Sequence, residues 1–304
     1  DMDRQYFAQH EPSLAEMVEK AIELLSKDKD GFFLMVEGSQ VDWAGHNNDP
    51  IYMVKDFIAF DDAVKKACDF ADEDGRTLVM AYPDHNTGGM KIGHNYTAMS
   101  YTATTVEDLV APLKGMTITS GGLAAMMAGD YSIGNIIAAV AEYWNIDVDE
   151  GVAQEILDYQ EDSGVSFNYA LAHVISKNYT VIGWTTHGHN GETVPVWVHG
   201  VDAPVGTIDN TDLALIAGDA MRTNLDKITH RLYVDMDDIT EDYVIDKTDP
   251  ENPVILVGKA KLPVSKDYML LKDRKIKLSG LTVYAPMTEK VYVSKKAAMM
   301  LKRR

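Results

Sequence analysis

Two short apolar runs, each followed at once by polar residues, constrain the fold of this chain more than any other feature. The run Phe32–Val36 contains no polar residue and leads directly into Glu37. An uninterrupted apolar run of strand length is typical of a strand that is buried on both faces in a parallel sheet. The run Leu78–Tyr82 has the same character, and Asp84 and His85 follow it. Each run therefore predicts a buried strand with polar side chains at its carboxyl end.

The segment between the two runs predicts a helix. Residues 51–73 have an amphipathic pattern, and Asp74–Gly75 is a turn signal just before the second run. Another helix is indicated ahead of the first run, where Ser13 and Glu16 have the spacing of a capping box. Strand, helix, strand is the order of a parallel βαβ unit. We therefore expect an α/β fold in three layers, in which helices flank a central, largely parallel sheet.

The rest of the chain divides by composition into a helical part and a β-rich part. Residues 104–178 show helical apolar spacing interrupted by Gly, Asp and Asn, which predicts a helical insertion over the sheet. Within it, His173 shares a predicted helix face with Tyr169, which favours a core or boundary histidine over a ligand. The alternating β-branched stretches beyond predict a small β-rich C-terminal appendage. We expect two domains, residues 1–222 and residues 223–304.

The chain is strongly acidic, with 47 acidic and 28 basic residues and a formal net charge of −19. Nucleic acid and anionic membrane surfaces would repel such a chain, so we expect neither as a partner. No apolar run is long enough to predict a transmembrane span. Cys68 is the only cysteine, which excludes a disulfide within the chain, and its place on a predicted helix favours a small buried hydrophobe.

Polar side chains near the predicted strand ends form the candidate functional site. Ligands of open α/β sheets bind outside the carboxyl ends of the strands, so two neighbouring strands would aim their polar residues into one crevice. A single acidic residue after a strand is more often a turn former or a helix cap. The recurrence of the pattern favours metal ligation. The side chains expected in this crevice are Glu37, Asp42, Asp84 and His85.

Asp42 and His46 have the sharpest local spacing. They are four residues apart, so one helical turn would place both on the same face and let them share an ion. A third segment, Thr185–Val196, adds His187 and His189 in a glycine-rich loop. Together the segments hold enough carboxylate and imidazole ligands for more than one divalent ion.

At these residues the chain resembles the alkaline phosphatase family. The matching segments occur in the same order as the family's three carboxyl-terminal metal motifs, and the resemblance covers roughly residues 12–220. Three motifs in this order are far more specific than any one of them. The segments are Val36–Asp42 with His46, Asp84–Gly89, and His189–Glu192 followed by Val194–Val196.

The resemblance implies a site with two zinc ions and one magnesium ion that hydrolyses phosphate monoesters. It also implies a homodimer and a location in the periplasm or outside the cell. By the resemblance, the first zinc would be held by Asp42, His46 and His189, the second zinc by Asp84 and His85, and the magnesium by Glu37.

The chain departs from the family pattern in the catalytic groups. In the family, the nucleophilic serine lies in an Asp-Ser-Ala type segment, accompanied by an Asp that bridges two metals, a Thr on magnesium and an Arg that grips phosphate. None of these has a counterpart in the sequence, and Trp43 stands where some members carry a Lys or His that contacts phosphate. We therefore expect the carboxyl-terminal portion of an alkaline phosphatase, with its nucleophile upstream of Asp1 and little or no activity alone.

Two other functions stay open. The chain could be a metal- or phosphate-binding protein without catalytic function, or a phosphodiesterase or phosphomutase that shares the two-metal core. An Asp-Ser-Ala-like segment upstream in the source gene would separate the phosphatase from the binding protein. If the second ion finds a replacement ligand within the chain, Asp49 and His187 are the first candidates.

Overall fold

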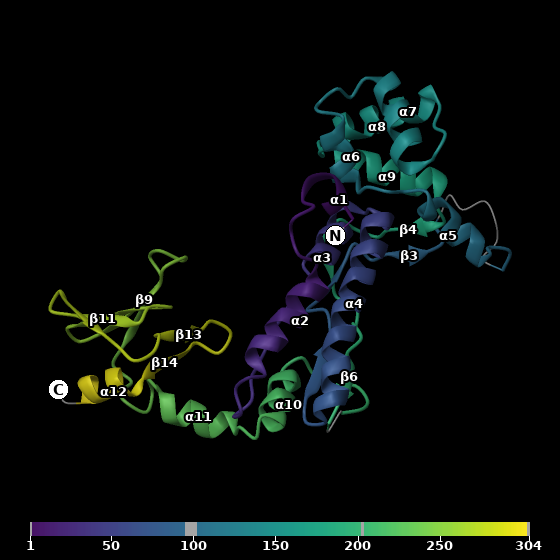
Figure 1. Cartoon of the computed structure of the whole chain (residues 1–304). Coiled ribbons are helices and arrows are strands. Elements are labelled where there is room, and N and C mark those ends of the chain that lie inside the picture. Colours follow the sequence, from purple (N-terminus) through teal and green to yellow (C-terminus); the bar gives the residue numbers. More distant parts are fainter. Residues whose placement is uncertain (1, 95–101, 202–203, 303–304) are drawn as a thin grey trace. The chain divides into compact units, whose positions relative to one another are not determined.

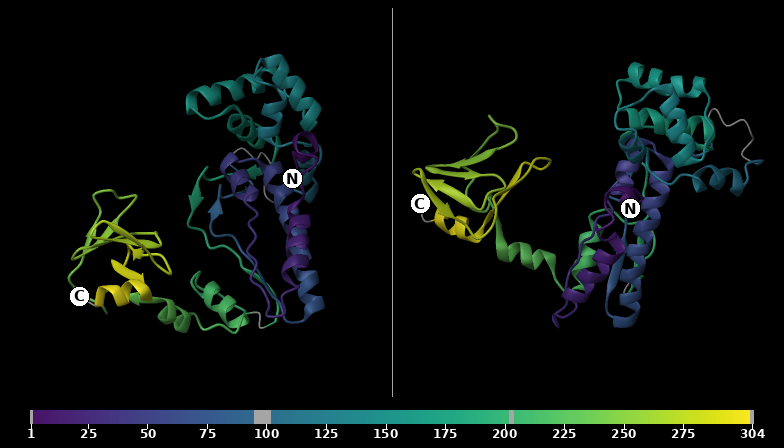
Figure 2. Two further views of the ribbon diagram at one scale, coloured as in Figure 1. Left: turned by 60° about the vertical axis from the view of Figure 1, so that its left-hand side comes forward. Right: turned by 45° about the horizontal axis from the view of Figure 1, so that its top comes forward.

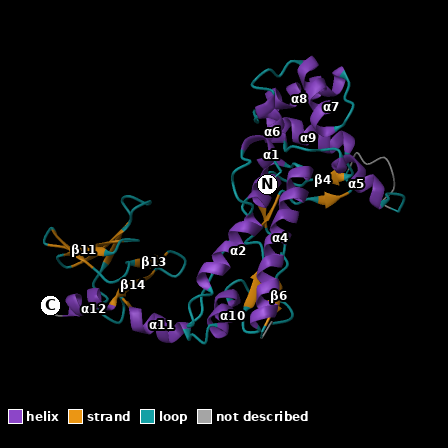
Figure 3. Cartoon of the chain, viewed as in Figure 1, coloured by secondary structure: helices purple, strands orange, loops and turns teal. Residues whose placement is uncertain are grey.

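Two compact units make up the chain, Asp1–Pro204 and Val205–Arg304. The computed structural model describes residues 2–94, 102–201 and 204–302. The first unit is mostly helical and the second contains most of the strands (Figure 3). None of the described helices is long and apolar enough to cross a membrane.

Helix boundaries in the first unit follow the capping residues. The Ser13 hydroxyl accepts a hydrogen bond from the Glu16 N–H, and the Glu16 carboxylate accepts one from the Ser13 N–H, which confirms the predicted capping box. The Asp49 carboxylate caps α4 through the N–H groups of Ile51 and Tyr52. The described helices of this unit are α1 (Arg4–Phe7), α2 (Leu14–Leu25), α3 (Gln40–Asn47), α4 (Pro50–Asp74), α5 (Val106–Lys114), α6 (Ser120–Met126), α7 (Ile133–Trp144), α8 (Glu150–Ser163) and α9 (Phe167–Tyr179).

Helices α2 and α4 lie side by side (Figure 2) and cover one side of residues 32–36. The ring of Phe32 packs against α4, and Leu34 packs on the small core between the two helices. Phe33 and Met35 alternate with them and are 63% and 73% exposed. The segment therefore has one covered apolar side and one bare apolar side.

The predicted strand at Phe32–Val36 is not formed, because residues 31–38 belong to no helix or strand. A strand needs neighbouring backbone to pair its N–H and C=O groups, and no described residue pairs with this segment. The apolar pattern indicates which side chains favour burial. It does not supply the second strand.

The sheets of the first unit are small. The second predicted strand is present as β1 (Leu78–Ala81), which pairs with β6 (Trp197–Gly200). Every pairing among the described residues is antiparallel, so the predicted largely parallel central sheet is not found there. The other pairs of this unit are β2 (Asn86–Thr87) with β5 (His189–Asn190), and β3 (Lys91–Ile92) with β4 (Ile182–Gly183).

Helices α6 to α9 gather at one end of the first unit (Figure 1), within the part of the sequence predicted to be helical. Their core includes Trp144, whose indole N–H donates a hydrogen bond to the Ile118 carbonyl at 2.7 Å. Both side chains are almost fully buried. This core also anchors α9, which contacts α3 and so supports the candidate site. Other fully buried members are Leu123, Ile136, Ile156, Leu171 and Ile175.

The second unit is built mainly from antiparallel strands around a core of its own. Its five-stranded sheet has the order β12-β11-β10-β9-β8, and its three-stranded sheet has the order β13-β14-β7. Met236, Ile255, Leu262 and Val293 are fully buried in this core. The elements are α10 (Asp212–Ala220), α11 (Leu225–Leu232), β7 (Tyr233–Asp235), β8 (Val244–Asp246), β9 (Val254–Val257), β10 (Ala260–Pro263), β11 (Tyr268–Leu271), β12 (Arg274–Lys277), β13 (Val283–Ala285), β14 (Lys290–Ser294) and α12 (Lys295–Lys302).

Candidate metal centre

Helix α3 presents Asp42 and His46 on one face. The helix forms over Gln40–Asn47, so the four-residue spacing becomes one helical turn, as the sequence predicted. The His46 Nε2 atom lies 3.4 Å from Asp42 Oδ2, and both side chains are partly exposed. One helix therefore provides a carboxylate and an imidazole that point toward the same spot.

The pairing of β2 with β5 brings His189 to the same place. Thr87 stands opposite His189 in the antiparallel register. The His189 Nε2 atom lies 3.7 Å from Asp42 Oδ1, and the Thr87 hydroxyl donates a 2.6 Å hydrogen bond to that same oxygen. One ligand atom each from Asp42, His46 and His189 lies within 4.8 Å of the others. Helix α3 and strand β5, about 140 residues apart along the sequence, thus bring their histidines to the same carboxylate, that of Asp42.

Glycines allow α3 to approach the β2 turn closely. A Cβ atom added at Gly45 would lie 2.8 Å from the Thr87 carbonyl oxygen, closer than real side chains come. Gly88, directly after β2, has a φ of +77°, a conformation that L side chains rarely adopt. These positions place Thr87 within reach of Asp42.

The types of the three side chains and their proximity suit zinc. Zinc takes His nitrogen and Asp oxygen at about 2.0–2.2 Å in tetrahedral geometry, which sets neighbouring ligand atoms about 3.4 Å apart. Asp42 Oδ2 lies 3.4 Å from His46 Nε2, the other oxygen, Oδ1, lies 3.7 Å from His189 Nε2, and one ligand atom from each of the three residues lies within 4.8 Å of the others. Three protein ligands would leave one position open, as in catalytic zinc sites. The donor set is therefore compatible with a zinc ion that can also bind a substrate.

His85 and Asp84 lie beside this triad. The His85 ring stacks on the His189 ring, with 3.5 Å between centroids, and His85 Nδ1 is 3.1 Å from the Thr87 hydroxyl oxygen. Asp84 Oδ2 lies 3.4 Å from His85 Nε2, but the Asp84 side chain is 86% exposed. Asp84 and His85 therefore lie next to the triad, but their ligand atoms are not part of the group that lies within 4.8 Å.

Glu37 is not part of the converging group. It is exposed and lines a pocket with Ser39, Tyr52 and Asp56. The described residues place no second group of three metal-ligand side chains around it. Its predicted role as a magnesium ligand stays a prediction.

Asp49 has a structural role. It is fully buried, and its carboxylate accepts hydrogen bonds from the backbone N–H groups of Ile51, Tyr52 and Ser120. Burial raises the pKa of this carboxyl group above its ordinary value. Because both oxygens are engaged, Asp49 is unsuited to serve as the replacement ligand for a second ion.

His173 behaves as the sequence predicted. Its ring stacks on Tyr159 with 4.2 Å between centroids, and burial lowers the pKa of its imidazole below the usual value. Cys68 is half-buried, and burial raises the pKa of its thiol.

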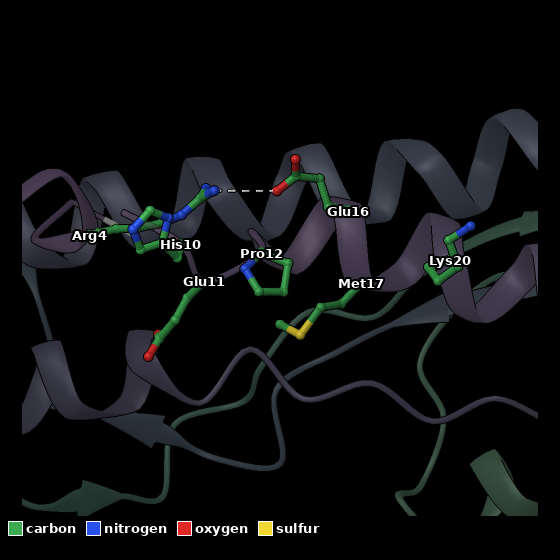
Figure 4. Close-up of a pocket in the computed structure, with 7 residues that line it drawn as sticks. All are labelled: Arg4, His10, Glu11, Pro12, Glu16, Met17 and Lys20. Atoms are coloured by element: carbon green, nitrogen blue, oxygen red, sulfur yellow. Dashed lines mark ion pairs between the residues drawn. The ribbon is translucent and has the colours of Figure 1, made fainter. Parts of the chain in front are cut away.

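A separate pocket near the amino terminus contains none of the predicted ligands (Figure 4). Arg4 and Glu16 face each other across it and form an ion pair at 3.5 Å. Met17 and Pro12 supply apolar walls. Nothing in this lining has the donor set of the triad on α3 and β5.

Thr87 and Asn48 are the residues whose roles the sequence reasoning missed. Thr87 orients Asp42, and the buried Asn48 amide donates hydrogen bonds to the carbonyls of Gly45 and Thr186, both at 2.8 Å. The available signal for Thr87 was its place two residues after His85 in a strand-like segment. Asn48 is a left-handed C-cap of α3, a position at which Asn is common.

A family comparison covers most of the chain. The profile of the alkaline phosphatase family matches residues 1–223, which include all six predicted ligands. This chain belongs to the alkaline phosphatase family. Alkaline phosphatase 3 of Bacillus subtilis is 35% identical over 217 residues, which are 70% of this chain and 45% of that protein. The repressible alkaline phosphatase of Saccharomyces cerevisiae is 28% identical over 246 residues, which are 72% of this chain and 42% of that protein.

Solved alkaline phosphatases share the fold. A cold-active enzyme from a Shewanella psychrophile superposes with a TM-score of 0.58 at 29% identity, over 69% of this chain and 50% of that one. The Thermus thermophilus enzyme superposes with a TM-score of 0.63 at 21% identity, over 73% and 50%. The fold is therefore α/β and alkaline-phosphatase-like. This member of the alkaline phosphatase family spans less than half of the two curated relatives and half of each of these structures.

Proposed function

We propose that this chain is the metal-binding, carboxyl-terminal portion of an alkaline phosphatase that hydrolyses phosphate monoesters with two zinc ions and one magnesium ion. The convergence of Asp42, His46 and His189 on one spot is the observation that carries the proposal. Family membership supports the reaction class. By resemblance to the family, we extend the proposal to a homodimer in the periplasm or outside the cell.

The side chains of this site would bind the metal ions and fix their positions. When bound, two zinc ions would neutralise charge on the phosphoryl oxygens and lower the pKa of a coordinated hydroxyl or water. The Thr87 hydroxyl would keep Asp42 turned toward the ion, since a hydrogen-bonded ligand keeps its orientation. The roles proposed for the ligands are Asp42, His46 and His189 on the first zinc, Asp84 and His85 on the second, and Glu37 on magnesium.

A further portion of the family fold, on the same chain or on another, would complete the active site. The chain spans less than half of the curated relatives, and its sequence contains no counterpart of the nucleophilic serine segment. Phe33 and Met35 form a bare apolar side beside α2 and α4, and no described strand pairs with this segment. A missing neighbour would bury these side chains and supply the nucleophile.

The decisive experiment combines zinc binding with complementation. The chain is loaded with zinc and magnesium and assayed on p-nitrophenyl phosphate, alone and after mixing with the amino-terminal portion of a family member such as Bacillus subtilis alkaline phosphatase 3. We expect bound zinc, very low activity alone, and a rise of at least tenfold on mixing. His46→Ala should abolish the rise. The partly exposed His199 on β6, which pairs with Asp72, offers the control His199→Ala, which should leave the rise unchanged.

The result also separates the other functions. Zinc binding without any gained activity would favour a metal- or phosphate-binding protein. Hydrolysis of bis-p-nitrophenyl phosphate in preference to the monoester would favour a phosphodiesterase. Absence of zinc binding would contradict the proposal altogether.

A further inference from the structure

His46 and His187 hold each other through a reciprocal pair of hydrogen bonds. The His46 Nδ1 atom lies 2.5 Å from the His187 carbonyl oxygen, and the His187 Nδ1 atom lies 2.8 Å from the His46 carbonyl oxygen. A backbone carbonyl can only accept. Each ring must therefore carry its proton on Nδ1 and donate it to the other residue's backbone.

This bond selects the tautomer of His46. With the proton on Nδ1, the neutral ring has its lone pair on Nε2, the atom that lies 3.4 Å from Asp42 Oδ2. A histidine binds a metal through its unprotonated nitrogen, and the hydrogen bond of the other nitrogen fixes the ring orientation. The His187 carbonyl thus prepares His46 to bind with Nε2.

The hydrogen bond between His46 Nδ1 and the His187 carbonyl also positions the loop that carries His189. Asn48 adds a hydrogen bond from its amide to the Thr186 carbonyl, and the Gly88 N–H donates to the Gly188 carbonyl at 3.1 Å. Residues 186–188 are therefore tied to the end of α3 on one side and to the β2 turn on the other. His189 follows this segment directly, so its backbone is held near α3.

The His187 ring is held at its outer side as well. It lies 5.5 Å from the Tyr169 ring and 6.3 Å from the His173 ring, both on α9, measured between centroids. The ring is thus half-buried between α3 and α9. His187 lies outside the group of converging ligand atoms, and its Nδ1 atom is already engaged by the His46 carbonyl. These contacts argue against its use as a ligand.

We propose that His187 is a positioning residue of the first zinc site. Its backbone carbonyl presets the His46 tautomer, and its side chain, which donates to the His46 carbonyl, holds the His189 loop against α3. The inference rests on the proposed function, in which Asp42, His46 and His189 bind zinc. Losing an outer contact of a metal site typically costs ten- to a hundredfold in metal affinity, and side-chain variants of His187 remove the contact with the His46 carbonyl.

Two amide substitutions test the geometry directly. In His187→Asn the side-chain N–H group can stand where Nδ1 stands, whereas in His187→Gln it is carried one carbon further, toward the position of Nε2. We expect zinc affinity, measured by competition with a chelator, to fall about tenfold or more in His187→Ala and His187→Gln. His187→Asn should recover most of it. His199→Ala is the matched control and should bind like the wild type.

A second readout needs no metal. In the metal-free protein, nitrogen-correlated NMR should show a proton on Nδ1 of His46, and His187→Ala should leave that proton in place because the acceptor is backbone. Thermal unfolding of the metal-free variants identifies any that fail to fold. If His187→Ala does not fold, the zinc affinities of His187→Asn and His187→Gln are compared with each other.

The outcomes distinguish the inference from the proposed function. If the wild type binds zinc and His187→Ala or His187→Gln binds it equally well, the inference is wrong and the proposed function stands. A His46 ring that carries its proton on Nε2 and none on Nδ1 in the metal-free protein would also overturn it. If the wild type binds no zinc, the proposed function fails and this inference fails with it.

Discussion

The backbone carbonyl of Gly45 occupies the space that a side chain at Gly88 would need. A Cβ atom added at Gly88 would lie 2.6 Å from that oxygen, well inside any real contact. The end of α3 and the turn after β2 therefore meet backbone to backbone. This contact keeps Asp42 beside Thr87 and His189, so the candidate zinc site depends on two residues without side chains.

Gly88→Ala should weaken zinc binding at least tenfold. The substitution combines a strained positive φ with a collision against backbone that cannot move without shifting α3. Gly75→Ala is the control, because Gly75 also has a positive φ but a Cβ there would meet nothing within 4 Å. Both variants should lose about 1–2 kcal/mol of stability from the left-handed backbone, and Gly88→Ala should lose more because of the collision. Equal zinc affinity in the two variants would show that the close approach does not hold the site.

Thr87→Val should lower zinc affinity about tenfold, since it removes the hydroxyl that donates to Asp42 Oδ1 while keeping the side-chain shape. Thr87→Ser retains the donor and should bind zinc nearly as well as the wild type. The measurement is a chelator competition in both variants. If Thr87→Val binds like Thr87→Ser, the hydrogen bond does not orient the carboxylate.

The stability of the first unit should fall as the pH drops below about 6.5, in part because of His173. Burial lowers the pKa of this imidazole in the folded chain from its ordinary value of 6.5. Between the two pKa values the unfolded chain binds the extra proton, so stability is present above pH 6.5 and is lost as the pH falls through that window. His173→Phe keeps a ring against Tyr159 and should flatten this dependence.

The His173 prediction can be checked by denaturant unfolding with tryptophan fluorescence, because all four tryptophans lie in the first unit. A chelator removes the contribution of any bound metal. The free energy of unfolding of the wild type should fall relative to that of His173→Phe as the pH is lowered. A constant difference from pH 5 to pH 8 would mean that His173 does not titrate in this range.

Phe33→Ser and Met35→Ser should each change the free energy of unfolding by about 0.5 kcal/mol or less, because these side chains are mostly exposed and touch no core. Leu34→Ser should cost about 1–3 kcal/mol, because Leu34 packs between α2 and α4. Both exposed-site variants should nevertheless reduce the activity gained on mixing with the amino-terminal portion. Unaltered complementation would show that this apolar side is not the contact surface.

Local signals in the sequence were sufficient for most helices. The capping box at Ser13 and Glu16 sets the start of α2, and the glycine after Asp74 ends α4, because these residues satisfy helix-end hydrogen bonds from within a few positions. The spacing of Asp42 and His46 also became a shared helix face for a local reason. Patterns of this kind need no distant partner.

The partners of each segment could be found only in the folded chain. Phe32–Val36 has the composition of a buried strand, yet it forms none, because strand pairing needs a neighbour that the described residues do not provide. His187 and His46 are 141 positions apart, so nothing in their local sequence indicates that each donates to the other's carbonyl. Helix caps depend on neighbouring residues, whereas strand pairing and the clamp around the candidate zinc site depend on long-range backbone contacts.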